Sequence, residues 1–289
     1  MKPGKYGPFP YSAITRRPRL ELPEGAQLAF WIIPNYEFFP LDEKCTPGSA
    51  VPPPDVISWS VRDYGNRVGA FRLMKVLDRY KLRATVALNS ELCVQHPELI
   101  EEGNARGWEW MGHGQSNTRP MKSVQDEPRV IRDALATIAQ ATGSRPVGWL
   151  GPALQETWNT LDCLADENVE YVCDWVNDDQ PYLMNLERGR RIVAMPYTLH
   201  LNDKIYESSN CSSGEFGAMI KRQFDVLYRE GAESGRVMSI AYHPYLSGVA
   251  HRIDDFDAAL EHICRHEGVW LATGSEIARH FVASSAGKG

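Results

Sequence analysis

Short apolar runs alternate along the chain with stretches in which apolar residues recur at helical spacing. The runs predict strands at 28–33, 83–88, 108–111, 147–150, 169–173, 192–195, 237–242 and 269–271. The helical spacing predicts helices at 66–80, 97–107, 123–141, 156–167, 214–230, 253–266 and 274–281, with Asn66 as the N-cap of the first. About seven or eight strands alternating with helices predict a parallel sheet that is closed, or nearly closed, into a barrel. A doubly wound open sheet is the alternative.

The domain organisation follows from where this alternation begins. Residues 1–25 are rich in Pro, Gly and Arg and show no periodicity, which predicts an extended arm that wraps the body or reaches a neighbouring subunit. Residues 26–289 contain no long Gly/Ser/Pro linker, so we expect one domain there.

Charge and composition argue against several classes of function. The net charge of −6 argues against a general nucleic-acid or anionic-membrane binder, and it fits a small or neutral substrate better. The amino-terminal stretch has no apolar run that could serve as a signal peptide, which predicts a cytoplasmic protein. The six cysteines are far apart and are expected to be free thiols. Nucleotide-binding glycine motifs are missing, so we expect no nucleotide cofactor.

Four ionisable residues each follow a different strand-like run: Glu37, His113, Asp174 and His243. In a barrel of parallel strands the carboxyl ends of the strands meet on one face, where catalytic groups collect. Each residue also has an ordinary interpretation as a loop residue, but four such positions together predict a site.

The neighbours of these residues indicate possible roles. Gly112 and Gly114 would let a ligand or ion approach the imidazole of His113, and Asn117 could reach the same point from one turn further on. Arg145 could orient the Glu37 carboxylate through a bidentate pair, although a surface arginine before a strand is equally compatible. His243, fixed by the proline that follows it, is suited to protonate a leaving nitrogen.

With these residues in hand, the chain resembles the NodB-type polysaccharide deacetylase superfamily, and within it the branch of PuuE-type allantoinases and related cyclic-amide hydrolases. The resemblance extends roughly from residue 11 to 281. It rests on Asn35-Tyr-Glu37, Tyr64-Gly-Asn-Arg-Val-Gly-Ala-Phe-Arg72, Gly112-His-Gly114, Arg145-Pro-Val-Gly-Trp149, Asp174-Trp-Val-Asn-Asp-Asp179, Met195-Pro-Tyr-Thr198, Phe224-Asp-Val-Leu-Tyr228 and Ser239-Ile-Ala-Tyr-His243.

The resemblance implies a single distorted (β/α) barrel of about seven strands that hydrolyses an amide-type C–N bond. It also implies a divalent metal such as zinc, held by an Asp and the two histidines of an H-x-x-x-H motif. Here Glu37 stands at the place of the Asp, Asn117 replaces the second histidine, and Asn35 lies near the expected catalytic base. An asparagine is a weak zinc ligand and cannot act as a base at neutral pH.

Our hypothesis from the sequence is a hydrolase of a non-peptide C–N bond in a small cyclic amide, ureide, imide or N-acyl compound. Glu37 would activate water directly or through a weakly held metal bound by Glu37, His113 and Asn117. His243 would donate the proton, Arg145 would orient the carboxylate, and Asp174 would position His243.

The aromatic residues Tyr36, Trp149 and Trp175, with Asn35, would shape a pocket too narrow for a polymer. Two alternatives stay open: a catalytically inactive barrel that binds a sugar or metabolite, and a metal-dependent polysaccharide deacetylase. The relatives and the amino-terminal arm lead us to expect a homo-oligomer.

Overall fold

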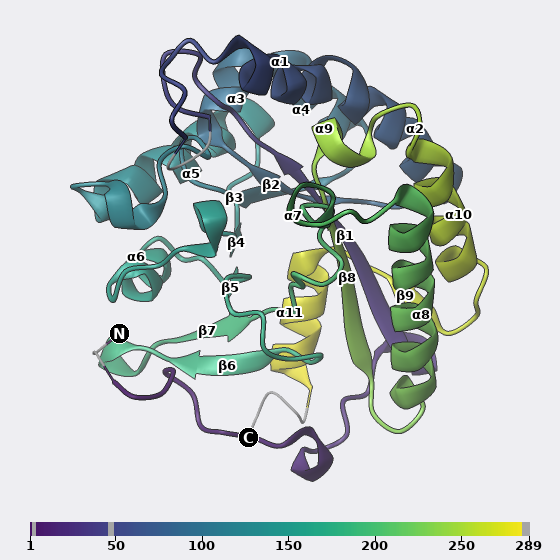
Figure 1. Ribbon diagram of the computed structural model, residues 1–289. Helices are drawn as coiled ribbons and strands as arrows, with labels where there is room; N and C mark the ends of the chain where they lie inside the picture. The colour runs from purple at the N-terminus through teal and green to yellow at the C-terminus, as the bar shows by residue number, and fades with distance from the viewer. Residues whose placement is uncertain (2–3, 46–48, 285–289) are drawn as a thin grey trace.

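A twisted sheet of mostly parallel strands forms the centre of the computed structural model, with most helices packed around its outer side and the last helix (Gly274–Ala283) packed against its inner side (Figure 1). The structure describes residues 1–284 apart from 2–3 and 46–48, so the ends of the predicted arm and domain fall partly outside the described residues. The strands are β1 (Leu28–Tyr36), β2 (Thr85–Leu88), β3 (Glu109–Gly112), β4 (Gly148–Trp149), β5 (Tyr171–Val172), β6 (Tyr182–Asn185), β7 (Arg191–Ala194), β8 (Arg236–Tyr242) and β9 (Val269–Leu271).

The strand order is β6-β7-β5-β4-β3-β2-β1-β8, and β9 pairs with the beginning of β1. Among these pairs, β6–β7 is antiparallel and the others are parallel. This arrangement confirms the predicted α/β class and its distorted barrel. Strand β6 was not predicted; its short sequence follows the polar residues 177–180.

The helices are α1 (Val56–Tyr64), α2 (Ala70–Arg79), α3 (Ser90–Gln95), α4 (Pro97–Ala105), α5 (Glu127–Thr142), α6 (Thr160–Asp166), α7 (Ile205–Ser208), α8 (Ser213–Gly231), α9 (Pro244–Ser247), α10 (Ile253–Cys264) and α11 (Gly274–Ala283). Each predicted helix has a counterpart, whereas α1, α3, α7 and α9 were not predicted. Helix α1 was not predicted because its apolar side chains, such as Ile57, are exposed and do not form one apolar face toward the core.

The prediction that Asn66 is an N-cap is wrong. Helix α1 begins after Asp55, whose side chain accepts a hydrogen bond from the backbone of Ser58. It then continues through a π-helical turn (Gly65–Gly69) directly into α2, so Asn66 lies inside a continuous helical stretch. Its side-chain amide donates to the backbone oxygen of Glu37 at 3.1 Å. Single π-helical turns are frequent at functional sites.

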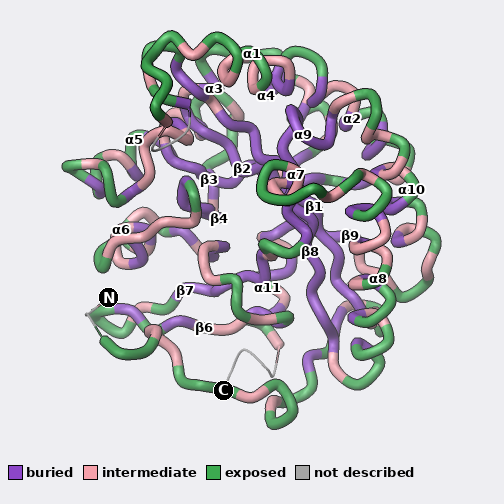
Figure 2. Tube along the Cα trace, viewed as in Figure 1, coloured by how far each residue is buried: buried purple, intermediate pink, exposed green. Residues whose placement is uncertain are grey.

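The two faces of the sheet bury different sets of side chains. Along β1, Ala29, Trp31 and Ile33 point into the barrel, where they pack with side chains of β3, β5, β7 and β8. Phe30 and Ile32 point outward and pack against the helices. Buried segments accordingly follow the strands, while the helices expose their outer faces (Figure 2). Side chains alternate between the two faces along a strand. The same alternation therefore decides which residue just beyond each strand end faces the barrel axis.

The barrel is not closed by strand pairing within the described part of the chain; irregular segments cross the opening beside β8. Val237 of β8 donates its backbone N–H to Asp179 at 2.9 Å, and Asp203 donates to Ala241 at 3.2 Å. The amino-terminal arm runs along the same region, where Gly235 donates to Leu20 at 2.8 Å. The arm therefore packs against its own chain, and contact with a neighbouring subunit stays a prediction.

All six cysteines are free thiols in the structure, as the sequence predicted. No helix of the described residues has the length and apolar character needed to cross a membrane.

Candidate active site

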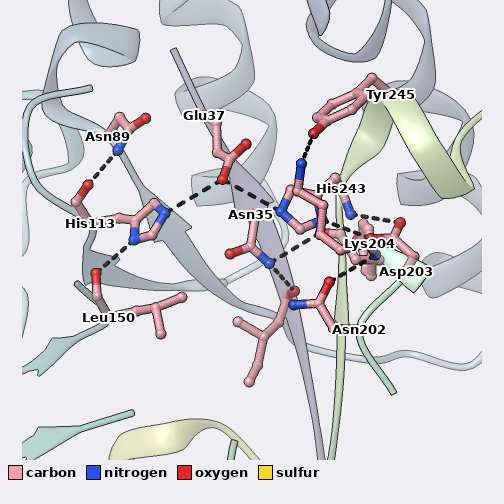
Figure 3. A network of polar contacts seen from close by, with 12 residues as sticks. Asn35, Glu37, Asn89, His113, Leu150, Asn202, Asp203, Lys204, His243 and Tyr245 are labelled. Atoms are coloured by element: carbon pink, nitrogen blue, oxygen red, sulfur yellow. Dashed lines mark hydrogen bonds and ion pairs between the residues drawn. The ribbon is translucent and has the colours of Figure 1, made fainter. Parts of the chain in front are cut away.

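Three of the four predicted residues meet at the carboxyl ends of β1, β3 and β8 (Figure 3). Oε1 of Glu37 lies 3.4 Å from Nε2 of His243 and 3.7 Å from Nε2 of His113. The exposed fractions of Glu37, His113 and His243 are 6%, 2% and 3%. The cluster is therefore a buried carboxylate between two imidazoles.

His243 is held by Asp203, a residue that the sequence did not single out. Nδ1 of His243 lies 2.7 Å from Oδ1 of Asp203, and the other carboxylate oxygen accepts hydrogen bonds from the backbone of His243 and from the hydroxyl of Ser247. The prediction that Asp174 positions His243 is wrong. Asp203 reaches this place because its segment forms a parallel bridge with β8, between Asn202 and Ala241. No local sequence pattern marks that bridge.

His113 is held by the backbone. Its Nδ1 lies 2.6 Å from the carbonyl oxygen of Leu150, so Nδ1 carries the hydrogen and donates it. The Asn89 side-chain amide in turn donates to the carbonyl oxygen of His113. Nε2 of His113 then presents a lone pair toward the Glu37 carboxylate.

The charges in this cluster reinforce one another. Burial lowers the pKa of His243, but the negative charges of Glu37 and Asp203 outweigh it and raise that pKa to about 9. Burial alone would raise the pKa of Glu37, yet the charge of His243 and the hydrogen bond from its Nε2 hold that pKa well below its usual range. At neutral pH the site therefore contains an ionised Glu37 beside a protonated His243.

Three buried acceptor atoms around this point lack a hydrogen-bond partner among the described residues: Oε2 of Glu37, Nε2 of His113 and Oδ1 of Asn117. Asn117 sits beside the Glu37 loop, since its backbone N–H donates to Phe38 at 3.2 Å. Buried acceptors without a donor are costly, and imidazole nitrogen and side-chain oxygen are atom types that bind a divalent cation. Glu37, His113 and Asn117 are therefore the residues that would hold the predicted metal. No group of three His, Cys, Asp or Glu suited to a metal occurs in the described ranges.

Arg145 does not orient Glu37. It precedes β4, at the amino end of that strand, and its guanidinium pairs with Glu167 at 2.6 Å on the surface, with 43% of the side chain exposed. The predicted role is therefore wrong, because catalytic groups of the barrel lie at the opposite, carboxyl ends of the strands.

Tyr36 and Trp149 do not line a pocket as predicted. Tyr36 follows the outward parity of β1 and packs in the core between sheet and helices, 6.4 Å from the ring of Trp108. Trp149 of β4 is likewise buried in the outer core with Leu135 of α5. Their aromatic character reflects packing.

Asn35 lies beside the cluster, and Trp175 lines a cavity that does not contain Glu37, His113 or His243. Asn35 points inward below Glu37, and its amide nitrogen donates to the carbonyl oxygens of Ile33 and Tyr242, both at 3.3 Å (Figure 3). Trp175, with Asp174 and Glu156, lines a cavity of about 570 Å³. These two predicted residues thus stay candidates for contact with substrate.

Lys204 and Tyr245 belong to the site but were missed in the sequence. The Lys204 ammonium donates to the hydroxyl of Tyr245 at 2.5 Å and to Glu207 at 2.7 Å, and its charge contributes to lowering the pKa of Glu37. Lys204 directly follows Asp203, so the same segment supplies both residues.

Comparison with known proteins agrees with this geometry. Residues 53–172 match the polysaccharide deacetylase family. A putative polysaccharide deacetylase of Schizosaccharomyces pombe is 27% identical over an alignment of 240 residues, which covers 76% of this chain and 75% of that protein. A peptidoglycan deacetylase of Helicobacter pylori is 27% identical over 262 residues, covering 79% of this chain and 88% of that one.

Among solved structures, the crystal structure of PuuE allantoinase superposes with a TM-score of 0.85 at 27% identity, covering 96% of this chain and 99% of that one. The match in sequence spans the region from α1 to β5, and the match in structure spans nearly the whole barrel, including the strands that carry Glu37, His113 and His243. The chain is therefore similar to polysaccharide deacetylases in sequence over residues 53–172, and to PuuE allantoinase in fold over nearly its whole length.

Proposed function

We propose that this protein hydrolyses an amide-type C–N bond in a small molecule such as a cyclic amide, ureide, imide or N-acyl compound. Hydrolysis of a non-peptide C–N bond is supported by the similarity to polysaccharide deacetylases and to PuuE allantoinase. The observation that carries the proposal is the Glu37 carboxylate held between His113 and the Asp203-bound His243.

The protonation states match the needs of hydrolysis. A water molecule attacks the carbonyl carbon and gives up a proton to the ionised Glu37. His243, protonated at neutral pH, then delivers its Nε2 proton to the leaving nitrogen as the C–N bond breaks. Asp203 keeps the imidazole of His243 in the orientation for this transfer.

The low pKa of Glu37 makes it a weak base by itself. A divalent cation held by Glu37, His113 and Asn117 would supply Lewis acidity that makes water a better nucleophile. Asn117 in place of a charged or imidazole ligand favours a weakly held cation.

The small size of the substrate is supported by burial. The three central side chains are almost inaccessible, and a polymer would need an open groove above them. The likeness to an allantoinase supports the same class. A cytoplasmic location and a homo-oligomeric assembly remain part of the proposal.

The test is a panel of substrates: allantoin, a cyclic imide and an N-acetylglucosamine oligomer, each with chelator and with added Zn²⁺ or Mn²⁺. We expect turnover of a small compound, and a loss of about 10²–10⁴-fold in His243→Gln. Turnover of the oligomer alone would overturn the small-substrate proposal in favour of a polysaccharide deacetylase. Binding without turnover of any compound would favour the inactive barrel.

A further inference from the structure

One peptide group connects His113 to Asp174. The carbonyl oxygen of Leu150 accepts the Nδ1 hydrogen of His113 at 2.6 Å, and the N–H of Gly151 donates to Oδ1 of Asp174 at 2.7 Å. This C=O and this N–H belong to the same Leu150–Gly151 peptide unit, which is planar and rigid. Fixing one end of the unit therefore fixes the other.

The Oδ2 atom of Asp174 is buried and has no hydrogen-bond partner among the described residues. A Cβ at position 151 would lie only 2.9 Å from Oδ2 of Asp174, so glycine there permits the close approach. The carboxyl group of Glu156 lies next to that of Asp174. Burial raises the pKa of both groups, to about 9 for Glu156 and to about 7 for Asp174, so the proton of the pair stays on Glu156 and Asp174 remains the acceptor for Gly151.

We propose that Asp174 is a positioning residue of the active site: its carboxylate orients the Leu150–Gly151 peptide group, which in turn fixes the ring and the tautomer of His113. The inference rests on the proposed function, because it concerns the histidine whose bare Nε2 faces Glu37. Both histidines are then oriented by a carboxylate, His243 directly by Asp203 and His113 through one peptide.

Hydrogen bonds in series polarise one another, so the bonds from Asp174 to His113 also strengthen each other electrostatically. The Asp174 carboxylate accepts a hydrogen bond from the Gly151 N–H and so polarises the peptide group. The Leu150 oxygen thereby becomes a stronger acceptor for the Nδ1 hydrogen of His113. The hydrogen then stays on Nδ1, and Nε2 stays free for a cation or a proton.

The test records which ring nitrogen of His113 carries the hydrogen, by long-range ¹H–¹⁵N spectra of the full chain labelled at histidine, with chelator present. His113→Gln assigns the resonances. We expect hydrogen on Nδ1 alone in the wild type and in Asp174→Asn, whose amide oxygen still accepts from Gly151. Asp174→Ala should populate both tautomers. Asp174→Leu, which fills the vacated space, gives the same test if Asp174→Ala does not fold.

Asp203→Asn is the matched control, because it removes the other carboxylate and should change the His243 resonances while leaving those of His113. An Asp174→Ala or Asp174→Leu protein whose His113 spectrum equals that of the wild type, with the His243 resonances intact, would overturn the inference. The readout needs no substrate, so it stands even if the proposed function fails. With an active substrate, Asp174→Ala should lower kcat about 10–100-fold with little change in KM.

Discussion

At the residue scale, the function depends on how each titratable side chain is partnered. Glu37 and the two histidines form the centre, and Asp203 sets the charge of His243. The sequence predicted Glu37, His113 and His243 because each directly follows an apolar run. It could not predict Asp203, since the partner of His243 lies 40 positions earlier in an irregular segment.

The pH dependence tests the pairing of His243 with Asp203. The pKa of His243 is raised to about 9, so kcat/KM should fall as pH rises through that value and the proton donor is lost. Because the charge of Asp203 is one cause of the raised pKa, Asp203→Asn should move this alkaline limb to lower pH. The measurement is the pH profile of kcat/KM for both proteins, and an unmoved limb in Asp203→Asn would refute the pairing.

At the element scale, the alternation of side chains along each strand decides which residues reach the site. Asn35 and Glu37 continue the inward positions of β1, whereas Tyr36 between them continues the outward ones. The apolar run predicted where the strand lies but not which of its faces points to the barrel axis, because β1 is buried on both sides. Trp149 was misplaced for the same reason.

Tyr36 provides a direct check of this orientation. Its ring is buried in the outer core and its hydroxyl has no partner among the described residues. Removing an unsatisfied buried hydroxyl should not destabilise the protein, so we expect Tyr36→Phe to keep or raise the free energy of unfolding by up to about 1 kcal/mol. The kinetics should be unchanged. Urea unfolding and kcat/KM measure both, and a marked loss of activity would place Tyr36 in the site after all.

At the scale of the whole molecule, the α/β barrel was predictable because strands and helices alternate regularly from residue 28 onward. The opening beside β8 was not predictable, because irregular segments and the amino-terminal arm fill it through single hydrogen bonds without periodicity. The arm nevertheless contributes Leu20 and Leu22 to the core inside the barrel. It is thus part of the folded body.

Substitutions in the amino-terminal arm should distinguish its buried residues from its exposed ones. Leu22→Ala removes a buried core side chain and should lower the free energy of unfolding by about 2–5 kcal/mol. The control is Tyr11→Ala, whose side chain is 79% exposed and whose loss should change stability by less than about 0.5 kcal/mol. Equal, small effects in urea unfolding would show that the arm is not anchored in the core.

The central claim is that Glu37 is the reactive carboxylate of a C–N hydrolase. The most direct measurement is kcat/KM of Glu37→Gln on the best small substrate, beside Glu43→Gln, which alters a neighbouring glutamate paired with Arg119 at the surface. We predict a loss of about 10²–10⁴-fold for Glu37→Gln and near wild-type turnover for Glu43→Gln. Wild-type turnover by a folded Glu37→Gln protein would contradict the account.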